Sequence, residues 1–227
     1  MLMETKRQAD GIVKEVHQSL EPVQMKPYYE AVKRLADLVF AALGIILLGW
    51  LFAFIALLIK LEDPKGPVFF KQTRCGKNGT PFTMYKFRSM ATDAEARWEA
   101  LQDQNEVSGL MFKIAEDPRV TRVGRWIRKT SIDELPQLWN VVKGDMSLVG
   151  PRPPLPREVK YYSEYHMQRL NVKPGCSGLW QATARNSVGF EEMVQLDLLY
   201  IQTRSTVLDM KIIVWTCLNM VLKRDAS

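Results

Sequence analysis

Two adjacent carboxylates, Asp133 and Glu134, follow the most basic stretch of this 227-residue sequence. No other acidic residue lies between Asp117 and Asp133, and the interval carries five basic residues: Arg119, Arg122, Arg125, Arg128 and Lys129. Adjacent carboxylates beside cations are able to hold a divalent cation and a phosphate group together. The pattern therefore predicts a phosphate-handling site, with Asp133 and Glu134 as candidate magnesium ligands and Arg128 as a neutralising cation.

The residues around the two carboxylates fit two alternative helix starts, which place the N-cap at different residues. With Asp133 as the N-cap, Pro136 falls in the first turn, where its missing N–H has no intrahelical partner to lose. The positive end of the helix dipole would then favour ionised carboxylates and a bound phosphate. The alternative is structural, because Ser131 and Glu134 match the spacing of a capping box. Pro136 argues against that register, since it would lie inside the helix and clash with a carbonyl group.

Further basic residues are candidates for binding phosphate. Lys86 and Arg88 alternate with aromatic residues, and a strand period of two would place them on one face, roughly 7 Å apart. That separation suits the two phosphates of a diphosphate. Arg152 lies between two prolines, whose stiff backbone suits bidentate phosphate contact, and Arg185 is a weaker candidate in a later loop. A solvated strand face and an ordinary proline-rich turn are the structural alternatives.

Other catalytic chemistries find no support in the sequence. The two histidines are isolated, which excludes a histidine-based triad and a zinc site. The spacing of the three cysteines fits neither a metal site nor a disulfide framework, so they indicate structural thiols in a reducing compartment: Cys75, Cys176 and Cys217.

The segment from Leu38 to Ile59 contains 22 consecutive uncharged residues, of which 20 are apolar. At about 1.5 Å per residue, a helix of this length reaches roughly 33 Å, enough for a hydrocarbon core of about 30 Å. A buried core helix is the alternative, but such helices usually carry a polar stripe. Basic residues flank both ends, so the charges leave spanning and re-entrant topologies open, and Gly49 lowers the cost of a central break.

The remaining pattern predicts an α+β fold that is mainly helical. We expect an N-terminal extension over 1–31, a membrane helix over 32–60 and a catalytic domain over 61–227. The domain should contain a β-hairpin from strands 68–74 and 82–90, and loops over 146–156 and 174–187. The predicted helices are 91–104, 120–129, 135–142, 157–170, 190–203 and 209–223. The last is amphipathic, which suits either a membrane interface or a closed core.

The net charge of +6 lies entirely after the apolar segment. Such a distribution is typical of polyanion binding, so one reading is a non-catalytic, membrane-anchored basic module for anionic lipid or nucleic acid. A non-catalytic scaffold for polysaccharide assembly is a further alternative. The acidic pair argues against a pure polyanion binder, which gains nothing from Asp133 and Glu134 beside its arginines.

Taken together, the motifs resemble one family: the bacterial sugar transferases that act as monotopic polyprenyl-phosphate phosphoglycosyltransferases. The resemblance covers about Lys33 to Lys223 and rests on the number and order of short strings. These strings are Lys33–Asp37, Gly66–Gln72, Lys86–Met90, Arg128–Gln137, Gly144–Pro153, Lys173–Gly175 and Gly178–Gln181.

The resemblance implies an enzyme that moves a sugar-1-phosphate from a UDP-sugar to undecaprenyl phosphate, initiating a bacterial glycoconjugate. Asp133 would be the nucleophile and form a covalent phosphosugar intermediate, with Mg²⁺ as cofactor and Glu134 helping to hold it. Arg128, Lys86 and Arg88 would neutralise phosphate charge. The sequence does not indicate which sugar is used.

The resemblance also implies a place at the cytoplasmic face of the bacterial inner membrane, with membrane lipid as partner, no nucleic acid partner, and a homodimer left open. It favours a re-entrant membrane helix. Family members often carry a Ser-Pro pair at the centre of that helix, where this sequence has Gly49-Trp50. The expected turn therefore rests on the resemblance and on the flanking charges.

Overall fold

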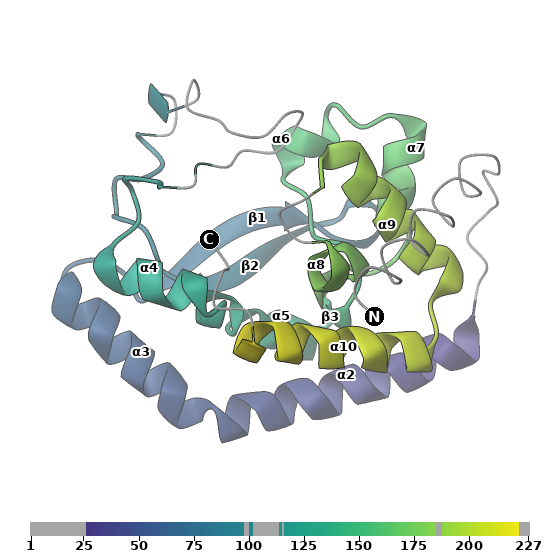
Figure 1. Ribbon diagram of the computed structural model, residues 1–227, viewed down its shortest axis with the longest axis horizontal. Helices are drawn as coiled ribbons and strands as arrows, with labels where there is room; N and C mark the ends of the chain where they lie inside the picture. The colour runs from purple at the N-terminus through teal and green to yellow at the C-terminus, as the bar shows by residue number, and fades with distance from the viewer. Residues whose placement is uncertain (1–25, 98–99, 102–113, 115, 185–187, 223–227) are drawn as a thin grey trace.

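The computed structural model describes residues 26–97, 100–101, 114, 116–184 and 188–222, and this part of the chain is mainly helical (Figure 1). It begins with two long helices, α2 (Pro27–Leu47) and α3 (Gly49–Glu62). In Figure 1 they form a bent pair along the lower edge, and the other described elements lie on one side of it. Most of the predicted N-terminal extension, 1–25, lies outside the described residues, and α2 starts before the predicted helix start at 32.

The predicted single membrane helix over 32–60 is two helices, bent by 59° between α2 and α3. The break is at Leu48, whose φ of −95° and ψ of 5° depart from helical values. A Cβ atom on Gly49 would meet nothing within 4 Å, so this glycine lowers helix propensity rather than making room for a neighbour. Among the described helices, none has the length and apolar composition to cross a membrane alone, and α2 with α3 qualifies only as the bent pair.

The predicted hairpin is confirmed as β1 (Phe69–Cys75) paired antiparallel with β2 (Pro81–Phe87). A single 3₁₀ turn, η1 (Lys77–Gly79), reverses the chain between them. The register places Phe70 opposite Lys86 and Arg74 opposite Phe82. Because opposed residues and alternate residues share a face of a sheet, Arg74 and Lys86 lie on the same face.

A second, parallel strand pair forms where the sequence predicted loops. It consists of β3 (Ser147–Val149) and β4 (Gly175–Ser177), and β4 is followed by the short helix α8 (Leu179–Thr183). Three-residue strands are too short to show the alternation of apolar and polar residues by which strands are recognised. Their partners come from 28 residues apart in the chain, Ser147 pairing with Gly175.

Four predicted helices are confirmed: α4 (Arg122–Lys129), α5 (Gln137–Lys143), α9 (Phe190–Thr203) and α10 (Thr206–Leu222). The predicted helix over 157–170 is instead α6 (Pro156–Val159), α7 (Glu164–Met167) and the 3₁₀ helix η4 (Gln168–Asn171). The chain restarts at Ser163, whose hydroxyl accepts a hydrogen bond from the His166 amide as an N-cap.

The predicted helix over 91–104 is not formed over its first seven residues, 91–97, which make turns, and most of the remainder lies outside the described residues. At its start, Met90 forms an isolated β-bridge with Val120 and the Ala91 amide donates to the Arg119 carbonyl. These contacts keep the start of the segment from adopting helical geometry.

Three apolar clusters form the core. The largest surrounds α9 and includes Val194, Tyr200, Ile201 and Ile212. The second packs Ala41 of α2 with Met84 of β2 and with Val141 and Met146. The third packs Ile55 and Ile59 of α3 with Phe87 of β2 and Ile127 of α4. The hairpin is therefore packed on both members of the bent helix pair.

Polar contacts attach the first half of α2 to the rest of the chain. The Arg34 guanidinium donates to the carbonyls of Val141 (2.6 Å) and Val142 (3.0 Å), near the C-terminal end of α5. Lys33 pairs with Asp209 of α10 at 2.8 Å. The buried Asp37 carboxylate accepts from the Leu148 amide of β3 at 3.0 Å.

A fully buried ion pair joins η4 to α9. Arg169, 2% exposed, donates through Nε (2.8 Å) and Nη2 (2.7 Å) to Oδ2 of Asp197, 0% exposed. The same guanidinium donates to the Tyr162 hydroxyl and to the backbone carbonyl of Arg152. This ion pair therefore also holds the loop that carries Arg152.

Replacing Asp197 with alanine should lower the free energy of unfolding by about 3–5 kcal/mol, because the Arg169 charge would stay buried without its partner. Denaturant unfolding of the detergent-solubilised protein measures the loss. Glu191→Ala is the control, since it removes the exposed partner of His166 and should cost less than about 1 kcal/mol. Equal losses in the two variants would contradict the assignment.

Candidate active site

The acidic pair lies in a tight turn between α4 and α5. Ser131 adopts a left-handed conformation with φ 56°, and the 3₁₀ turn η3 (Ile132–Glu134) follows. Helix α5 then starts after Pro136, which is its N-cap. Both predicted registers are therefore wrong: Asp133 is not the N-cap of α5, and the Ser131 side chain makes no capping hydrogen bond. Left-handed Ser131 prevents α4 from continuing into α5, and the carboxylates occupy the turn between the two helices.

The two carboxylates have different surroundings. Asp133 is 8% exposed, and burial raises its pKa to about 6 even though Lys86 and Arg128 act in the opposite direction. Burial alone would raise the pKa of Glu134 too, but contact with Lys86 and the charge of Arg152 hold that pKa below its usual value. Lys86 Nζ lies 2.6 Å from Glu134 Oε1. Glu134 is thus the paired carboxylate and Asp133 the carboxylate left for chemistry.

Two more predicted cations are close enough to act on the pair. Arg128, in the last turn of α4, lowers the pKa of Asp133, and Arg152 lowers that of Glu134. Within the part of the chain that the structure describes, neither guanidinium is paired with a carboxylate. Both are therefore available to an anionic ligand. The fourth predicted residue of this kind, Arg185, lies outside the described residues.

Arg88 does not join the site as the sequence predicted. Its side chain is 7% exposed and pairs with Asp63, just beyond the end of α3, while Lys86 pairs with Glu134. The expected two-cation grip on one strand face is not formed. Strand β2 ends at Phe87, so the pleat no longer directs Arg88, and the carboxylate of Asp63 attracts it instead.

Arg74 is a site residue that the sequence analysis missed. It is buried on β1, where Nη1 donates to the Pro153 carbonyl at 2.9 Å and Nε and Nη2 donate to Oε1 of Gln72. Burial, and then the charge of Arg152, lowers its pKa to about 10. The contact holds the Arg152 loop against the hairpin. The hairpin register would have placed Arg74 on the same face as Lys86.

Asn140 is a second missed residue, and it aligns α5 with β2. This fully buried side chain accepts from the Tyr85 amide at 3.0 Å and donates to the Thr83 carbonyl at 2.6 Å. The amide group thus continues the hydrogen bonding of the strand edge. The alignment brings Glu134, just before α5, to Lys86 on β2.

Asp133 and Glu134 are the adjacent carboxylates of the site that could hold a metal ion. No group of three or more potential metal-binding side chains is found among the described residues. Magnesium is usually bound by one or two carboxylates together with water and substrate phosphates, so two adjacent carboxylates fit an ion that is shared with a phosphate-bearing substrate.

The chain is also similar to known proteins. The family model described as bacterial sugar transferase matches residues 28–223. The chain is 48% identical over 196 residues to the galactosyl transferase CpsE of Streptococcus agalactiae, a match covering 86% of this chain and 43% of CpsE. It is 38% identical over 200 residues to the undecaprenyl-phosphate galactose phosphotransferase of Salmonella typhimurium, covering 86% and 41% respectively.

A shorter relative matches over nearly its whole length. The exopolysaccharide production protein ExoY of Rhizobium meliloti is 37% identical over 206 residues, which cover 89% of this chain and 91% of ExoY. By contrast, the chain spans about two fifths of the length of CpsE and of the Salmonella transferase. The family match includes the bent helix pair, the hairpin and the turn that holds Asp133 and Glu134, and the chain therefore belongs to the bacterial sugar transferase family.

Proposed function

We propose that this protein transfers a sugar-1-phosphate from a UDP-sugar to undecaprenyl phosphate, initiating synthesis of an exopolysaccharide, capsule, O-antigen or glycoprotein glycan. The observation that supports this function most strongly is the buried Asp133 beside Glu134, with Lys86, Arg128 and Arg152 around them. Relatives named as undecaprenyl-phosphate galactose and glucose phosphotransferases support the substrate classes.

In the first step, a carboxylate oxygen of Asp133 attacks the sugar-bearing phosphorus of the UDP-sugar. The new oxygen–phosphorus bond forms as the bond to UMP breaks, and UMP leaves with the bonding electron pair. An ionised carboxylate needs no general base for this attack, so the proposed step requires no histidine. The product is a phosphosugar joined covalently to Asp133.

In the second step, a phosphate oxygen of undecaprenyl phosphate attacks the same phosphorus. The bond to Asp133 breaks, its carboxylate is restored, and undecaprenyl-diphosphate-sugar is released. Phosphoryl transfer depends mainly on positioning and on neutralisation of charge. Arg128 and Arg152 would contact donor phosphates, while Lys86 keeps Glu134 ionised and in place.

Asp133 and Glu134 would also hold Mg²⁺ when the donor binds. Bound there, the ion would neutralise phosphate charge during transfer. Arg88 has no direct role in this proposal, because its guanidinium is paired with Asp63.

A non-catalytic basic module for anionic lipid or nucleic acid is the alternative function. This function would give Asp133 and Glu134 no role. In the structure, Lys86 is also paired with Glu134 and is therefore not a free cation for a polyanion. Such a module would release no UMP from any UDP-sugar, with or without magnesium.

We further propose that the bent pair enters the membrane from one side and returns to it. Both ends of the pair contact the same part of the chain: Arg34 of α2 binds the end of α5, and Glu62 of α3 accepts from the first amides of α4. A catalytic part attached to both ends lies on one side of the bilayer. UDP-sugars are cytoplasmic metabolites, which would make that side the cytoplasmic face of the inner membrane.

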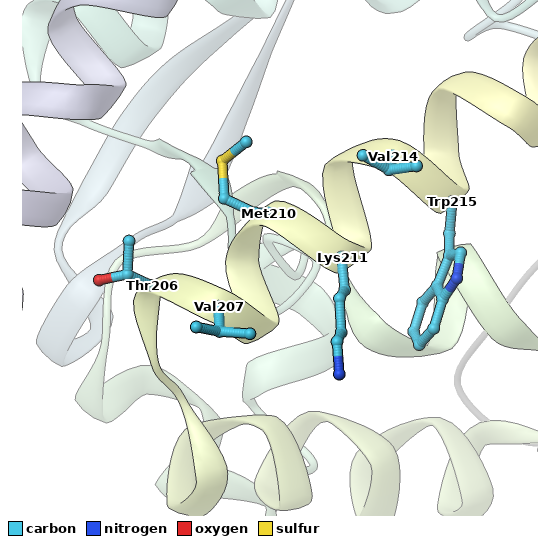
Figure 2. A pocket seen from close by; sticks show the side chains of 6 residues that line it. All are labelled: Thr206, Val207, Met210, Lys211, Val214 and Trp215. Carbon is cyan, nitrogen blue, oxygen red and sulfur yellow. The ribbon is translucent and has the colours of Figure 1, made fainter.

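The exposed apolar surface supports this arrangement. The bent pair exposes large apolar side chains along both helices, including Leu43, Ile46, Leu47, Trp50, Phe54 and Leu57. Helix α10 lies alongside α2 and exposes Val207, Met210, Val214 and Leu218 by 45–65%. Figure 2 shows the surface hollow on α10, lined by Thr206, Val207, Met210, Lys211, Val214 and Trp215. A helix that exposes apolar side chains along one face in this way is suited to the membrane interface.

The Asp133→Asn variant should lose sugar-phosphate transfer by at least about 1,000-fold, because the amide has no ionised oxygen to attack phosphorus. UMP release from a panel of UDP-sugars, with undecaprenyl phosphate and magnesium present, measures the loss. Asp93→Asn is the control, since this exposed carboxylate contacts Arg97 and should leave the rate unchanged. Full activity of Asp133→Asn in a folded, membrane-bound protein would remove the nucleophile assignment.

Cysteine labelling should place both ends of the bent pair on the cytoplasmic side. In a Cys217→Ser background, Thr5→Cys and Glu164→Cys should each resist a membrane-impermeant maleimide in intact spheroplasts and react after lysis. Glu164 is exposed on the catalytic part and serves as the reference position. Labelling of Thr5→Cys before lysis, with Glu164→Cys still protected, would mean that the helix pair spans the membrane.

A further inference from the structure

We propose that Glu62 and Asp63, at the end of α3, are positioning residues for the transfer reaction, which hold the two cation-bearing segments of the active site to the bent helix pair. The inference rests on the proposed function. Neither residue was a candidate on sequence grounds, and neither contacts the Asp133–Glu134 pair. Each acts through a different element, and each element carries one of the cations that act on Asp133.

Asp63 holds the end of β2. Its Oδ2 accepts from the Arg88 guanidinium, and its backbone carbonyl accepts from the same group at 3.3 Å. Oδ1 accepts from the amides of Lys65 (3.2 Å) and Gly66 (3.1 Å), and these hydrogen bonds orient the carboxylate that pairs with Arg88. Arg88 follows Lys86 by two residues. The position of Lys86, and with it the contact to Glu134, therefore depends on this attachment.

Glu62 holds the start of α4. Its Oε1 accepts from the Arg122 amide at 2.8 Å and its Oε2 from the Val123 amide at 3.1 Å. The first amides of a helix lack partners within the helix, and the dipole at that end favours a negative charge. Arg128 lies in the last turn of the same eight-residue helix. Thr121 is the N-cap of α4, and Glu62 binds the next two amides, so this helix start is attached to the end of α3. Because α4 has eight residues, the same attachment helps to place Arg128 at its other end.

Two glycines lie where these segments pack closely, Gly66 against the Arg88 side chain and Gly124 against the Ser89 backbone. A Cβ atom on Gly66 would lie 1.9 Å from Nη1 of Arg88, and one on Gly124 would lie 1.9 Å from the Ser89 carbonyl oxygen. The Thr121 amide also donates to the Ser89 carbonyl at 3.1 Å. The end of α3, the end of β2 and the start of α4 thus form one closely packed junction.

This junction has a consequence for catalysis. Lys86 is on β2 and pairs with Glu134, while Arg128 is in the last turn of α4, just before the turn that holds Asp133. A displacement of α3 would move both. A misplacement of about 1 Å is enough to slow an enzyme by about 100-fold, so the rate of transfer should be sensitive to both attachments.

The test measures kcat and KM for UDP-sugar with each protein in lipid nanodiscs. Glu62→Ala and Asp63→Ala should each lower kcat by about tenfold or more, mainly without raising KM, because neither residue contacts substrate. Glu62→Gln keeps an oxygen acceptor for the α4 amides and should recover most of the rate. Lys65→Ala, which changes an exposed side chain in the same segment, should keep the wild-type rate.

A double-mutant cycle separates positioning from general loss of structure. If Asp63 acts through Arg88, then Asp63→Ala should add little to the loss already caused by Arg88→Ala, while Glu62→Ala should add its full effect. A raised KM in Arg88→Ala would instead indicate direct donor binding by Arg88 and would overturn this assignment.

Further results would also overturn the inference. These are a kcat within twofold of wild type in both alanine variants, additive effects of Asp63→Ala and Arg88→Ala, or a loss of rate explained by a lower Tm that Glu62→Gln does not relieve. In each case an active wild-type enzyme leaves the proposed function standing. A wild-type protein without transferase activity would refute the proposed function and this inference together.

Discussion

The contact between Lys86 and Glu134 is the interaction on which the site depends. Lys86 Nζ and Glu134 Oε1 lie 2.6 Å apart, and their contact joins the hairpin to the turn between α4 and α5. The two residues are 48 residues apart in the chain. The positive charge of Lys86 offsets the negative charge of Glu134, which reduces the repulsion between the two adjacent carboxylates. Among the described residues, Glu134 is paired with a cation, whereas Asp133 is buried and accepts no hydrogen bond from one. Asn140 aligns the two elements that make this contact, and Arg74 attaches the Arg152 loop to the same hairpin.

The bent helix pair supplies the base on which these elements are arranged. Its outer surface is apolar and exposed, while its inner surface packs on the hairpin through Ile55, Ile59 and Phe87. Polar groups at both of its ends bind the catalytic part: Arg34 and Asp37 at one end, Glu62 and Asp63 at the other. The same packing therefore supports both the arrangement of the site and the membrane attachment proposed above, which would suit a lipid acceptor.

Local signals predicted much of this arrangement. The apolar segment, the hairpin, α4 and α9 follow from residue periodicity, and the acidic pair stands out because it ends a basic run. The structure places Lys86 in contact with Glu134 and the charges of Arg128 and Arg152 close to the acidic pair, while the phosphate-binding roles of these cations stay predictions. The apolar segment, the hairpin and the helices depend on neighbours within a few residues, which is the range that a sequence pattern reports.

The features that the sequence did not predict depend on long-range competition or on unusual backbone geometry. Arg88 was assigned to phosphate because nothing local indicates that Asp63, 25 residues earlier, would bind it. The pairing of β3 with β4 also joins distant segments. The turn at Asp133 depends on a left-handed Ser131, a conformation that residues other than glycine adopt only rarely, and no helix-capping pattern signals it.

The proposed covalent bond between Asp133 and the sugar phosphate is tested most directly by intact-protein mass spectrometry after incubation with the UDP-sugar, without lipid acceptor. If Asp133 is the nucleophile, the protein gains the mass of one sugar phosphate, located on Asp133 and removed when undecaprenyl phosphate is added. A protein that transfers sugar phosphate at normal rates yet shows no such adduct, even when rapidly quenched, would contradict the two-step mechanism.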